Sequence, residues 1–431
     1  MHNLDLNLDE ISKIEGKASC SIKIREGKAV EVKFTIAEYK RFYTQAIRGK
    51  DAVALPQLTS RICGTCSNAH LLCTAKAVEN ALGLIPSEQT VKLRELLNFG
   101  LIIRDHGLHL YVFVLPDIFA KDSLLDFDEN NKEQHELLHD AFEVKAAGNK
   151  LGTVVGGRSV HAPFVAVGGF SRLPDLGQLK NTVQILEKAR PKAVKLAKLF
   201  FERDETLIRK NLHFCALLDE QFSFLNGKIW ETNGPPVSEE QFGNHLQHVV
   251  IPYSHASGYK YKGKVYMVGA LARLNLGKDK LHEKTRRELK NELGVFPSDN
   301  IHHNNLAQAV EIVHSIDSSI DIINSIKEII PKKPQIPIRR EGIGTGVIEA
   351  PRGTLYYRLE VDGTGKIKNG TIVVPTGQNQ LGIEEAIKTF LTQKVISEQN
   401  RQETENSIER IVRSYDPCMS CASHFLKFKY H

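Results

Sequence analysis

The sequence predicts a mainly helical α+β protein with a core of long helices and flanking β-hairpins. Two observations predict this class. Several segments of more than ten residues repeat apolar residues at the helical period, and two shorter segments alternate apolar and polar residues as hairpin strands do. A third observation concerns the ends of the chain, where two C-x-x-C pairs lie, and it predicts that both ends meet at one buried metal site.

The composition limits the classes of protein to which this chain can belong. The chain has 431 residues, of which 41% are hydrophobic and 25% charged, as in an ordinary soluble globular protein with a large core. Its net charge of +6 is small and no long run of like charge occurs, so nucleic-acid binding is not expected. The sequence shows neither a secretory leader at its start nor an apolar run long enough for a membrane span. We therefore expect a cytoplasmic protein.

The first half of the chain contains three regular segments. Residues 18–36 alternate around "REGK" and predict a β-hairpin, and residues 67–82 predict a helix that Gly83 ends. Residues 88–114 predict a buried helix, because apolar residues occur on all its sides. Its ionisable residues, which need partners inside the protein, are Arg104, Asp105, His106 and His109.

Residues 152–174 are rich in glycine and proline and predict an irregular, turn-forming segment. Helical patterns follow over residues 177–212 and 304–330. The segment "PKKPQIP", residues 331–337, reads as a linker or a surface loop and is the one plausible domain boundary.

The last hundred residues contain a second hairpin and two helices. Residues 353–375 alternate on both sides of "DGTGK" and predict the hairpin. Helices are predicted over residues 383–395 and 401–413, just before the second cysteine pair.

The cysteines carry the chemistry. Cys63 and Cys66 form one C-x-x-C pair and Cys418 and Cys421 the other, and two such turns can supply four thiolates to a metal. A structural zinc site is the simplest interpretation, although zinc ribbons usually keep their pairs within about 15–20 residues. Soft thiolates also suit nickel, iron and iron-sulfur clusters. The other cysteines, Cys20, Cys73 and Cys215, read as small buried hydrophobes.

The two cysteine motifs carry a family resemblance. "RICGTCSNAH" and "DPCMSCASH" resemble the two signature motifs of the nickel-iron hydrogenase large (catalytic) subunit. Between them "KIEGK", "RDHGLH", "GGRSVHAP", "EAPRGTLYY" and "VVPTGQN" are similar to further family segments in the same order, so that the resemblance spans about residues 10–424. It is nearest to the cytoplasmic branch that passes electrons to nicotinamide, deazaflavin or heterodisulfide reductase partners.

The resemblance implies the fold of that subunit as a single domain, 1–424, and reversible heterolytic cleavage of H2. It implies that Cys63 and Cys418 bind nickel terminally, and that Cys66 and Cys421 bridge the nickel to an iron that carries carbon monoxide and cyanide ligands.

Further site residues follow from the same resemblance. Glu15 would accept the proton beside Cys418. The guanidinium of Arg352 would lie beside the open coordination position of the metals, held in place by Asp105 and Asp416. On the residues alone, Glu15 reads as a solvated carboxylate and Arg352 as a turn residue.

Four more positions complete the implied site. Thr376, which follows Pro375, would hydrogen-bond a cyanide ligand, and His70 would hydrogen-bond a cysteine sulfur. His424 would be a ligand of a magnesium-like ion near the C-terminus. Thr44 stands where the family has a carboxylate ligand of that ion, which puts the magnesium site in doubt because a hydroxyl binds a hard cation weakly.

The resemblance also implies partners. An iron-sulfur small subunit is required, because the chain has no further cysteine clusters with which to relay electrons. Further electron-transfer subunits of flavin, NAD(P), deazaflavin or heterodisulfide reductase type are expected, with maturation factors and an endopeptidase that could remove residues 425–431. The alternative functions are a non-catalytic, structural subunit of a larger redox complex and a zinc-stabilised scaffold.

Overall fold

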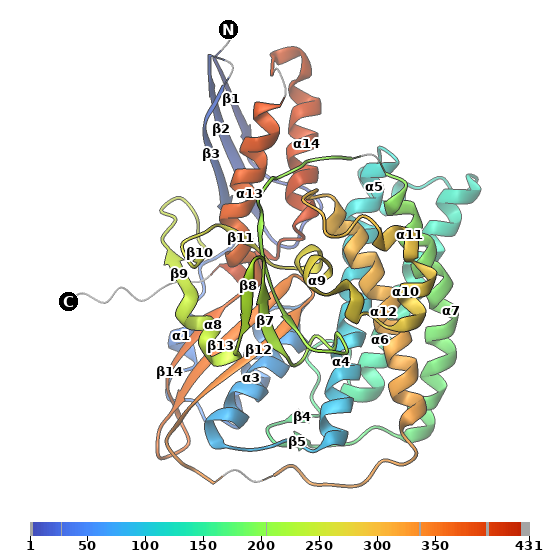
Figure 1. Ribbon diagram of the computed structural model, residues 1–431, viewed down its shortest axis with the longest axis vertical. Coiled ribbons are helices and arrows are strands. Elements are labelled where there is room, and N and C mark those ends of the chain that lie inside the picture. Colours follow the sequence, from blue (N-terminus) through green and yellow to red (C-terminus); the bar gives the residue numbers. More distant parts are fainter. Residues whose placement is uncertain (1–2, 27, 204, 336–337, 394–395, 424–431) are drawn as a thin grey trace, which may run out of the picture.

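The structure is a computed structural model that describes residues 3–26, 28–203, 205–335, 338–393 and 396–423. It mixes long helices with small sheets, as expected for the predicted class (Figure 1). One large hydrophobic cluster joins residues from both ends of the chain and from the middle.

Four long helices form one side of the molecule (Figure 1). They are α4 (Glu88–Leu108), α6 (Lys132–Gly156), α7 (Leu176–Phe201) and α12 (His303–Ser325). Each helix packs against the next, α4 on α6, α6 on α7, α7 on α12 and α12 back on α4, so that the ring is closed. Apolar side chains fill its centre, and the ionisable residues of α4 are buried among them.

A three-stranded antiparallel sheet stands at one end of the molecule, beside α13 (Pro375–Thr392) and α14 (Arg401–Ser414) (Figure 1). Its strands are β1 (Leu4–Leu8), β2 (Ala18–Arg25) and β3 (Lys28–Ile36). The predicted hairpin is therefore confirmed, whereas β1 was not predicted. Alternate side chains of β1 and β2 are buried, as the sequence pattern requires.

A second three-stranded sheet lies under α3 (Ser67–Leu82). It consists of β12 (Gly342–Ala350), β13 (Gly353–Val361) and β14 (Ile367–Val373), of which the predicted hairpin covers the last two. A Cβ atom at Gly344 or Gly346 would lie 2.0 or 2.4 Å from a backbone oxygen of α3, so glycine alone permits this close approach. The approach brings the first cysteine motif, which precedes α3, to the end of the sheet.

The structure corrects the prediction that residues 152–174 are irregular from their start. Helix α6 continues through Gly156 and ends at Gly157, which has φ +82°. The glycines in its last turns mark close packing: a Cβ at Gly148 would lie 2.6 Å from the backbone nitrogen of Arg104 on α4. The sequence pattern could not distinguish glycines that end a helix from glycines that let two helices approach.

Other boundaries differ in detail. The helix predicted over 67–82 has the observed bounds, and the one over 88–114 comprises α4 followed by a π-helix, η2 (His109–Val114). The helix predicted over 177–212 ends at Phe201, and the one over 304–330 ends at Ser325.

The C-terminal helices also agree in part. Helix α13 begins at Pro375, eight residues before the predicted start, because proline is well suited to the first turn of a helix. The end predicted for that helix, 394–395, lies outside the described residues. Helix α14 confirms the prediction over 401–413.

The middle of the chain forms small sheets that were not predicted. The order β11-β6-β7-β8 makes a four-stranded sheet, and two pairs, β10-β9 and β4-β5, make short ribbons. The strands are β4 (Val165–Ala166), β5 (Gly169–Phe170), β6 (His213–Leu218), β7 (Lys228–Glu231), β8 (Gly234–Val237), β9 (Leu246–Val249), β10 (Gly258–Tyr261) and β11 (Tyr266–Met267). The remaining helices are short: α1 (Tyr43–Ala46), α2 (Leu55–Thr59), α5 (Leu115–Ile118), α8 (Glu239–His245), α9 (Ala270–Gly277), α10 (Glu283–Glu288), α11 (Lys290–Leu293) and α15 (Met419–Ala422).

Among the described residues, no helix combines the length and the apolar character that crossing a bilayer requires.

Candidate metal centre

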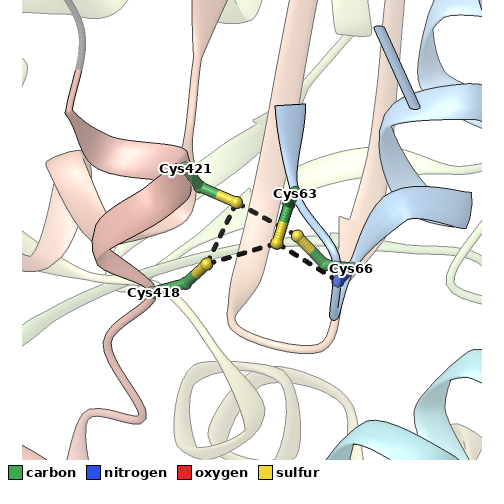
Figure 2. A group of neighbouring side chains, drawn as sticks. All are labelled: Cys63, Cys66, Cys418 and Cys421. Carbon is green, nitrogen blue, oxygen red and sulfur yellow. Dashed lines mark hydrogen bonds between the residues drawn. The ribbon is translucent and has the colours of Figure 1, made fainter. Parts of the chain in front are cut away.

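The four cysteines of the two C-x-x-C pairs meet in the interior (Figure 2). The sulfur of Cys63 lies 3.5 Å from that of Cys418, and the sulfur of Cys66 lies 3.1 Å from that of Cys421. All four are buried free thiols, and their sulfurs lie within 4.8 Å of one another. This span is close to twice a metal–sulfur bond of about 2.3 Å, so one small metal cluster fits between them.

A local backbone contact and an arginine side chain from a distant helix hold the first pair in place. Cys66 is the residue before α3, and its backbone N–H points at the sulfur of Cys63, 3.4 Å away. The guanidinium of Arg104 on α4 donates to the carbonyl oxygen of Thr65, between the two cysteines, and to that of Ser159. A buried helix thus holds the loop of the first motif by its peptide groups.

The second pair sits on α15. Cys418 precedes this short helix and Cys421 lies inside it. The hydroxyl of Tyr43, on α1, lies within hydrogen-bond distance of the carbonyl oxygens of Cys421 (2.5 Å) and Ser423 (3.1 Å). A tyrosine from near the N-terminus therefore ties down the end of the segment that carries the C-terminal thiols.

The electrostatics of the cluster call for a cation. Hydrogen bonds from the neighbouring thiols, Cys418 first, hold the pKa of Cys63 well below its ordinary value. Burial raises the pKa of Cys418 well above the ordinary value. Four thiolates cannot share one buried site unless positive charge balances them, so full deprotonation requires bound metal.

Glu15 is brought to the second pair, as the resemblance implies. The thiol of Cys418 donates to Glu15 Oε2 at 3.1 Å, and the backbone N–H of Ser420 donates to the same oxygen at 3.0 Å. Glu15 Oε1 accepts from the hydroxyl of Ser420. The carboxylate is therefore directed at the sulfur and is not a freely solvated surface group.

Arg352 lies in the turn between β12 and β13, beside the sulfurs. Its Nη1 donates to Asp105 Oδ2 at 2.6 Å, and its Nη2 forms an ion pair with Asp416 Oδ1 at 3.0 Å. Within the part of the chain that the structure describes, Arg352 Nε and Asp105 Oδ1 are buried without a hydrogen-bond partner. Buried polar atoms are rarely left so, and their position beside the cluster fits a site built for a bound group.

A small enclosed cavity adjoins three of the four thiols. Its lining includes Cys66, Cys418, Cys421, Arg352, Pro375, Thr376 and His70. The hydroxyl of Thr376 accepts from the backbone N–H of Cys418 at 2.9 Å, which leaves its own hydrogen to donate into the cavity.

His70 contacts the cluster through one ring nitrogen. Its Nε2 lies 3.5 Å from the sulfur of Cys421, and its Nδ1 lies 2.7 Å from the hydroxyl of Tyr357. Burial lowers the pKa of His70 to about 4, so the ring is neutral at pH 7. If Nδ1 accepts from the Tyr357 hydroxyl, the neutral ring carries its proton at Nε2 and can donate it to the sulfur.

The ion site expected near the C-terminus stays a prediction. His424 lies outside the described residues. Thr44 is half-buried at the start of α1, next to Tyr43. Among the described residues, the only group of three or more side chains able to hold a metal is the four-cysteine cluster.

Sequence reasoning missed several residues around the centre. Tyr43 and Tyr357 gave no signal, because an isolated tyrosine in an apolar pattern reads as core. Gln308 on α12, whose Nε2 donates to Asp416 Oδ2 at 2.9 Å, gave none either. Arg273 was not singled out either, although a charge inside an apolar stretch is a signal that could have found it.

Four buried thiols that converge from both chain ends, with a carboxylate in contact with one sulfur and a guanidinium lining the same cavity, indicate a metalloenzyme. The family model described as "Nickel-dependent hydrogenase" matches residues 41–137 and 228–424. The chain belongs to this family and is a catalytic large subunit of the nickel-iron hydrogenase type.

Individual relatives agree over nearly the whole chain. The alpha subunit of sulfhydrogenase 1 from Pyrococcus furiosus is 31% identical over 428 residues, which cover 98% of this chain and 99% of that protein. One subunit of the F420-non-reducing hydrogenase from Methanothermobacter thermautotrophicus is 27% identical and covers 97% and 94%. A crystal structure of an NAD+-reducing [NiFe]-hydrogenase in its H2-reduced state superimposes with a TM-score of 0.81 at 22% identity and covers 98% and 99%. This last likeness confirms the predicted fold.

Proposed function

We propose that this subunit cleaves H2 reversibly and heterolytically, to protons and electrons, at a nickel and an iron with carbon monoxide and cyanide ligands. Cys63 and Cys418 would hold the nickel, and Cys66 and Cys421 would bridge the two metals. When bound, the metal pair supplies an open, polarizable position at which H2 can be split. The observation that carries the proposal is the carboxylate of Glu15, 3.1 Å from a sulfur of the buried four-thiol cluster.

Glu15 has the geometry of a proton acceptor. Its Oε2 lies within direct hydrogen-bond reach of the Cys418 sulfur, so a proton can pass between the two atoms without an intervening water. Ser420 binds both carboxylate oxygens, one through its N–H and the other through its hydroxyl. These contacts keep the carboxylate directed at the sulfur while the proton is transferred.

Arg352 supplies a fixed positive charge beside the thiolates. Burial opposes the charged form of this guanidinium, but Asp105 and then Asp416 outweigh that effect and raise its pKa well above the ordinary value. A permanent cation held by two carboxylates stabilises negative charge that develops near it without reorganisation. Asp105 and Asp416 thus act through Arg352.

The remaining residues of the cavity would shape the iron side of the centre. The Thr376 hydroxyl could donate its hydrogen to a small ligand such as cyanide, and the ring of Pro375 would give that ligand an apolar contact. The Nε2–H of His70 would reduce the electron density on the Cys421 sulfur. A magnesium-like ion near His424 would need another oxygen ligand, because a hydroxyl, Thr44, stands where the family has a carboxylate.

Electrons must leave through other proteins. The only group of metal-binding side chains among the described residues is the four-cysteine cluster, so an iron-sulfur small subunit is needed as the first acceptor. Two relatives are named as single subunits of hydrogenases, which supports a multi-subunit enzyme. Its further electron-transfer subunits would be of flavin, NAD(P), deazaflavin or heterodisulfide reductase type. Maturation factors would load the metals, and an endopeptidase could remove 425–431. All seven cysteines are free thiols, which fits the reducing cytoplasm.

Metal analysis of the protein purified from its own host tests the proposal. Nickel and iron in equal amounts, together with infrared bands of carbon monoxide and cyanide and with hydrogen uptake, are expected. Stoichiometric zinc without nickel would instead identify a zinc scaffold, and a metal-free, inactive but stably assembled subunit would identify a structural role.

A further inference from the structure

A fully buried arginine, Arg273 on α9, uses all its hydrogen-bond donors. Its Nε and Nη2 bind the two carboxylate oxygens of Glu311, on α12, at 2.6 and 2.7 Å. Its Nη1 donates to Glu349 Oε2 at 2.7 Å and to the carbonyl oxygen of Ala350 at 3.1 Å, and its Nη2 also donates to the carbonyl oxygen of Pro351 at 3.0 Å. These five contacts account for the five N–H groups of a guanidinium.

The contacts converge on one turn. Glu349 and Ala350 end β12, and Pro351 follows them directly before Arg352 in the connection to β13. Glu349 is also bound from the far side of the turn, because the hydroxyl of Thr354 donates to its Oε1 at 2.6 Å. Arg273 therefore clamps the backbone from which Arg352 reaches the thiols.

The same clamp extends to the partner of Arg352. Glu311 Oε2 lies 2.9 Å from Nε2 of His106, the neighbour of Asp105 on α4. Helix α9 itself starts against the turn, since a Cβ at Gly269 would lie 3.2 Å from the carbonyl oxygen of Arg352. One buried charge cluster thus fixes both ends of the Arg352–Asp105 ion pair.

We infer that Arg273 is a positioning residue for the reaction and acts through Arg352, whose proposed role it presupposes. A lysine cannot replace it, because a single ammonium has three donors and no planar fork and cannot bind Glu311 at both oxygens while holding two carbonyls. With the clamp loosened, the guanidinium of Arg352 would lose its fixed place beside the cluster.

A double-mutant cycle tests the inference in the purified, metal-loaded complex. Arg273→Lys should lower hydrogen uptake per bound nickel by about 10- to 100-fold, the usual effect of removing a supporting contact at a metal site. Arg352→Lys should lower it as well. The double variant should be no slower than Arg352→Lys alone, because residues that act through one another are not additive.

Arg190 provides a matched control. It is a buried arginine that binds both oxygens of Asp317 on the same helix α12, at 2.6 and 2.8 Å, and it also contacts Glu288. Arg190→Lys should cost comparable thermal stability but leave turnover per nickel unchanged. If Arg273→Lys proves insoluble, Glu349→Gln loosens the same turn while the cation stays, and it should give the same kinetic loss.

A second readout uses the metal-free chain. Amide hydrogen exchange of residues 349–354 should speed up in Arg273→Lys and stay unchanged in Arg190→Lys. Unchanged exchange, or losses that simply add in the double variant, would overturn the inference. Hydrogen turnover in the unmodified complex tests the proposed function separately, so the two failures are distinguishable.

Discussion

Glu15 and Cys418 contact each other twice, although they are 403 positions apart in the sequence. Their backbones form an isolated parallel β-bridge, and the thiol donates to the carboxylate at 3.1 Å. The bridge fixes the backbone and so the direction of the carboxylate. One feature of the fold therefore positions the proposed proton acceptor and the proposed metal ligand together.

Replacing Glu15 by glutamine should block proton transfer and leave the metals in place. The amide is nearly the same size but cannot take up a proton, so hydrogen uptake and isotope exchange between H2 and water should fall by about 10²- to 10⁴-fold. Nickel and iron contents should stay at the wild-type level. Glu10→Gln, at an exposed position, is the control, and normal exchange in Glu15→Gln would rule out its role.

Cys421→Ser should remove metal binding without unfolding the core. A serine hydroxyl is a much harder ligand than a thiolate, so nickel and iron contents should drop and hydrogen turnover should fall to background. The free energy of unfolding of the metal-free chain should change by about 1 kcal/mol, as for a typical substitution. Cys215→Ala alters a thiol that is buried in a separate cluster and should keep full metal content. Turnover that survives in Cys421→Ser would contradict the assignment of this ligand.

Tyr43→Phe should loosen the C-terminal cysteine segment. The change leaves the carbonyl oxygens of Cys421 and Ser423 without this donor, at a cost of about 1–3 kcal/mol if they stay buried. We expect a lower melting temperature, faster amide exchange over 418–423 and less bound nickel. Tyr111→Phe, which removes a single 3.4 Å contact to the carbonyl of Lys192, should leave nickel binding unchanged. Equal effects of the two changes on nickel binding would contradict the claim that the Tyr43 hydroxyl holds the C-terminal cysteine segment.

The metal-free chain should become less stable as the pH falls from about 6.5 to about 4. Burial lowers the pKa of His314 to about 4 and outweighs the carbonyl of Phe222, which accepts from Nε2 and raises the pKa. The other ring nitrogen, Nδ1, accepts from the N–H of His282. Between about pH 6.5 and pH 4, His314 is protonated in the unfolded chain but stays neutral in the folded chain. The stability present above pH 6.5 is thus lost, by up to about 3 kcal/mol from this histidine, until the folded form also titrates near pH 4.

Urea unfolding at several pH values measures this loss. His314→Gln should weaken the pH dependence and leave the contribution of His70, whereas a change at the exposed His135 should not alter it. A wild-type slope identical to that of His314→Gln would contradict the prediction.

The sequence predicted best what local periodicity determines. The helix over 67–82, with Gly83 behind it, and both hairpins follow from spacing and turn residues, which act over a few positions. It predicted least where packing overrides composition: the glycines of α6 read as breakers, although they let α4 approach closely. Short strands such as β7 and β8 carry too few residues to show any alternation.

At the metal centre, the residue types indicated metal binding, but four thiols alone left zinc, nickel and iron open. The pairing of Glu15 with Cys418, and of Arg352 with Asp105, came from family resemblance, because nothing local in the chain links positions hundreds of residues apart. Arg273 shows the limit most clearly. Its role rests on peptide oxygens of a turn, and backbone acceptors have no signature in a sequence.

The distance along the chain between the two thiol pairs has a consequence for biosynthesis. Cys63 and Cys418 are 355 residues apart, so a ribosome that adds about 5–20 residues per second makes the first pair roughly 20 to 70 s before the second. During that interval the nascent polypeptide has only two of the four cysteine ligands, and abundant ions such as zinc could bind them. Insertion of the correct metals must therefore wait until translation has passed the last cysteine, and the early thiols need protection until then.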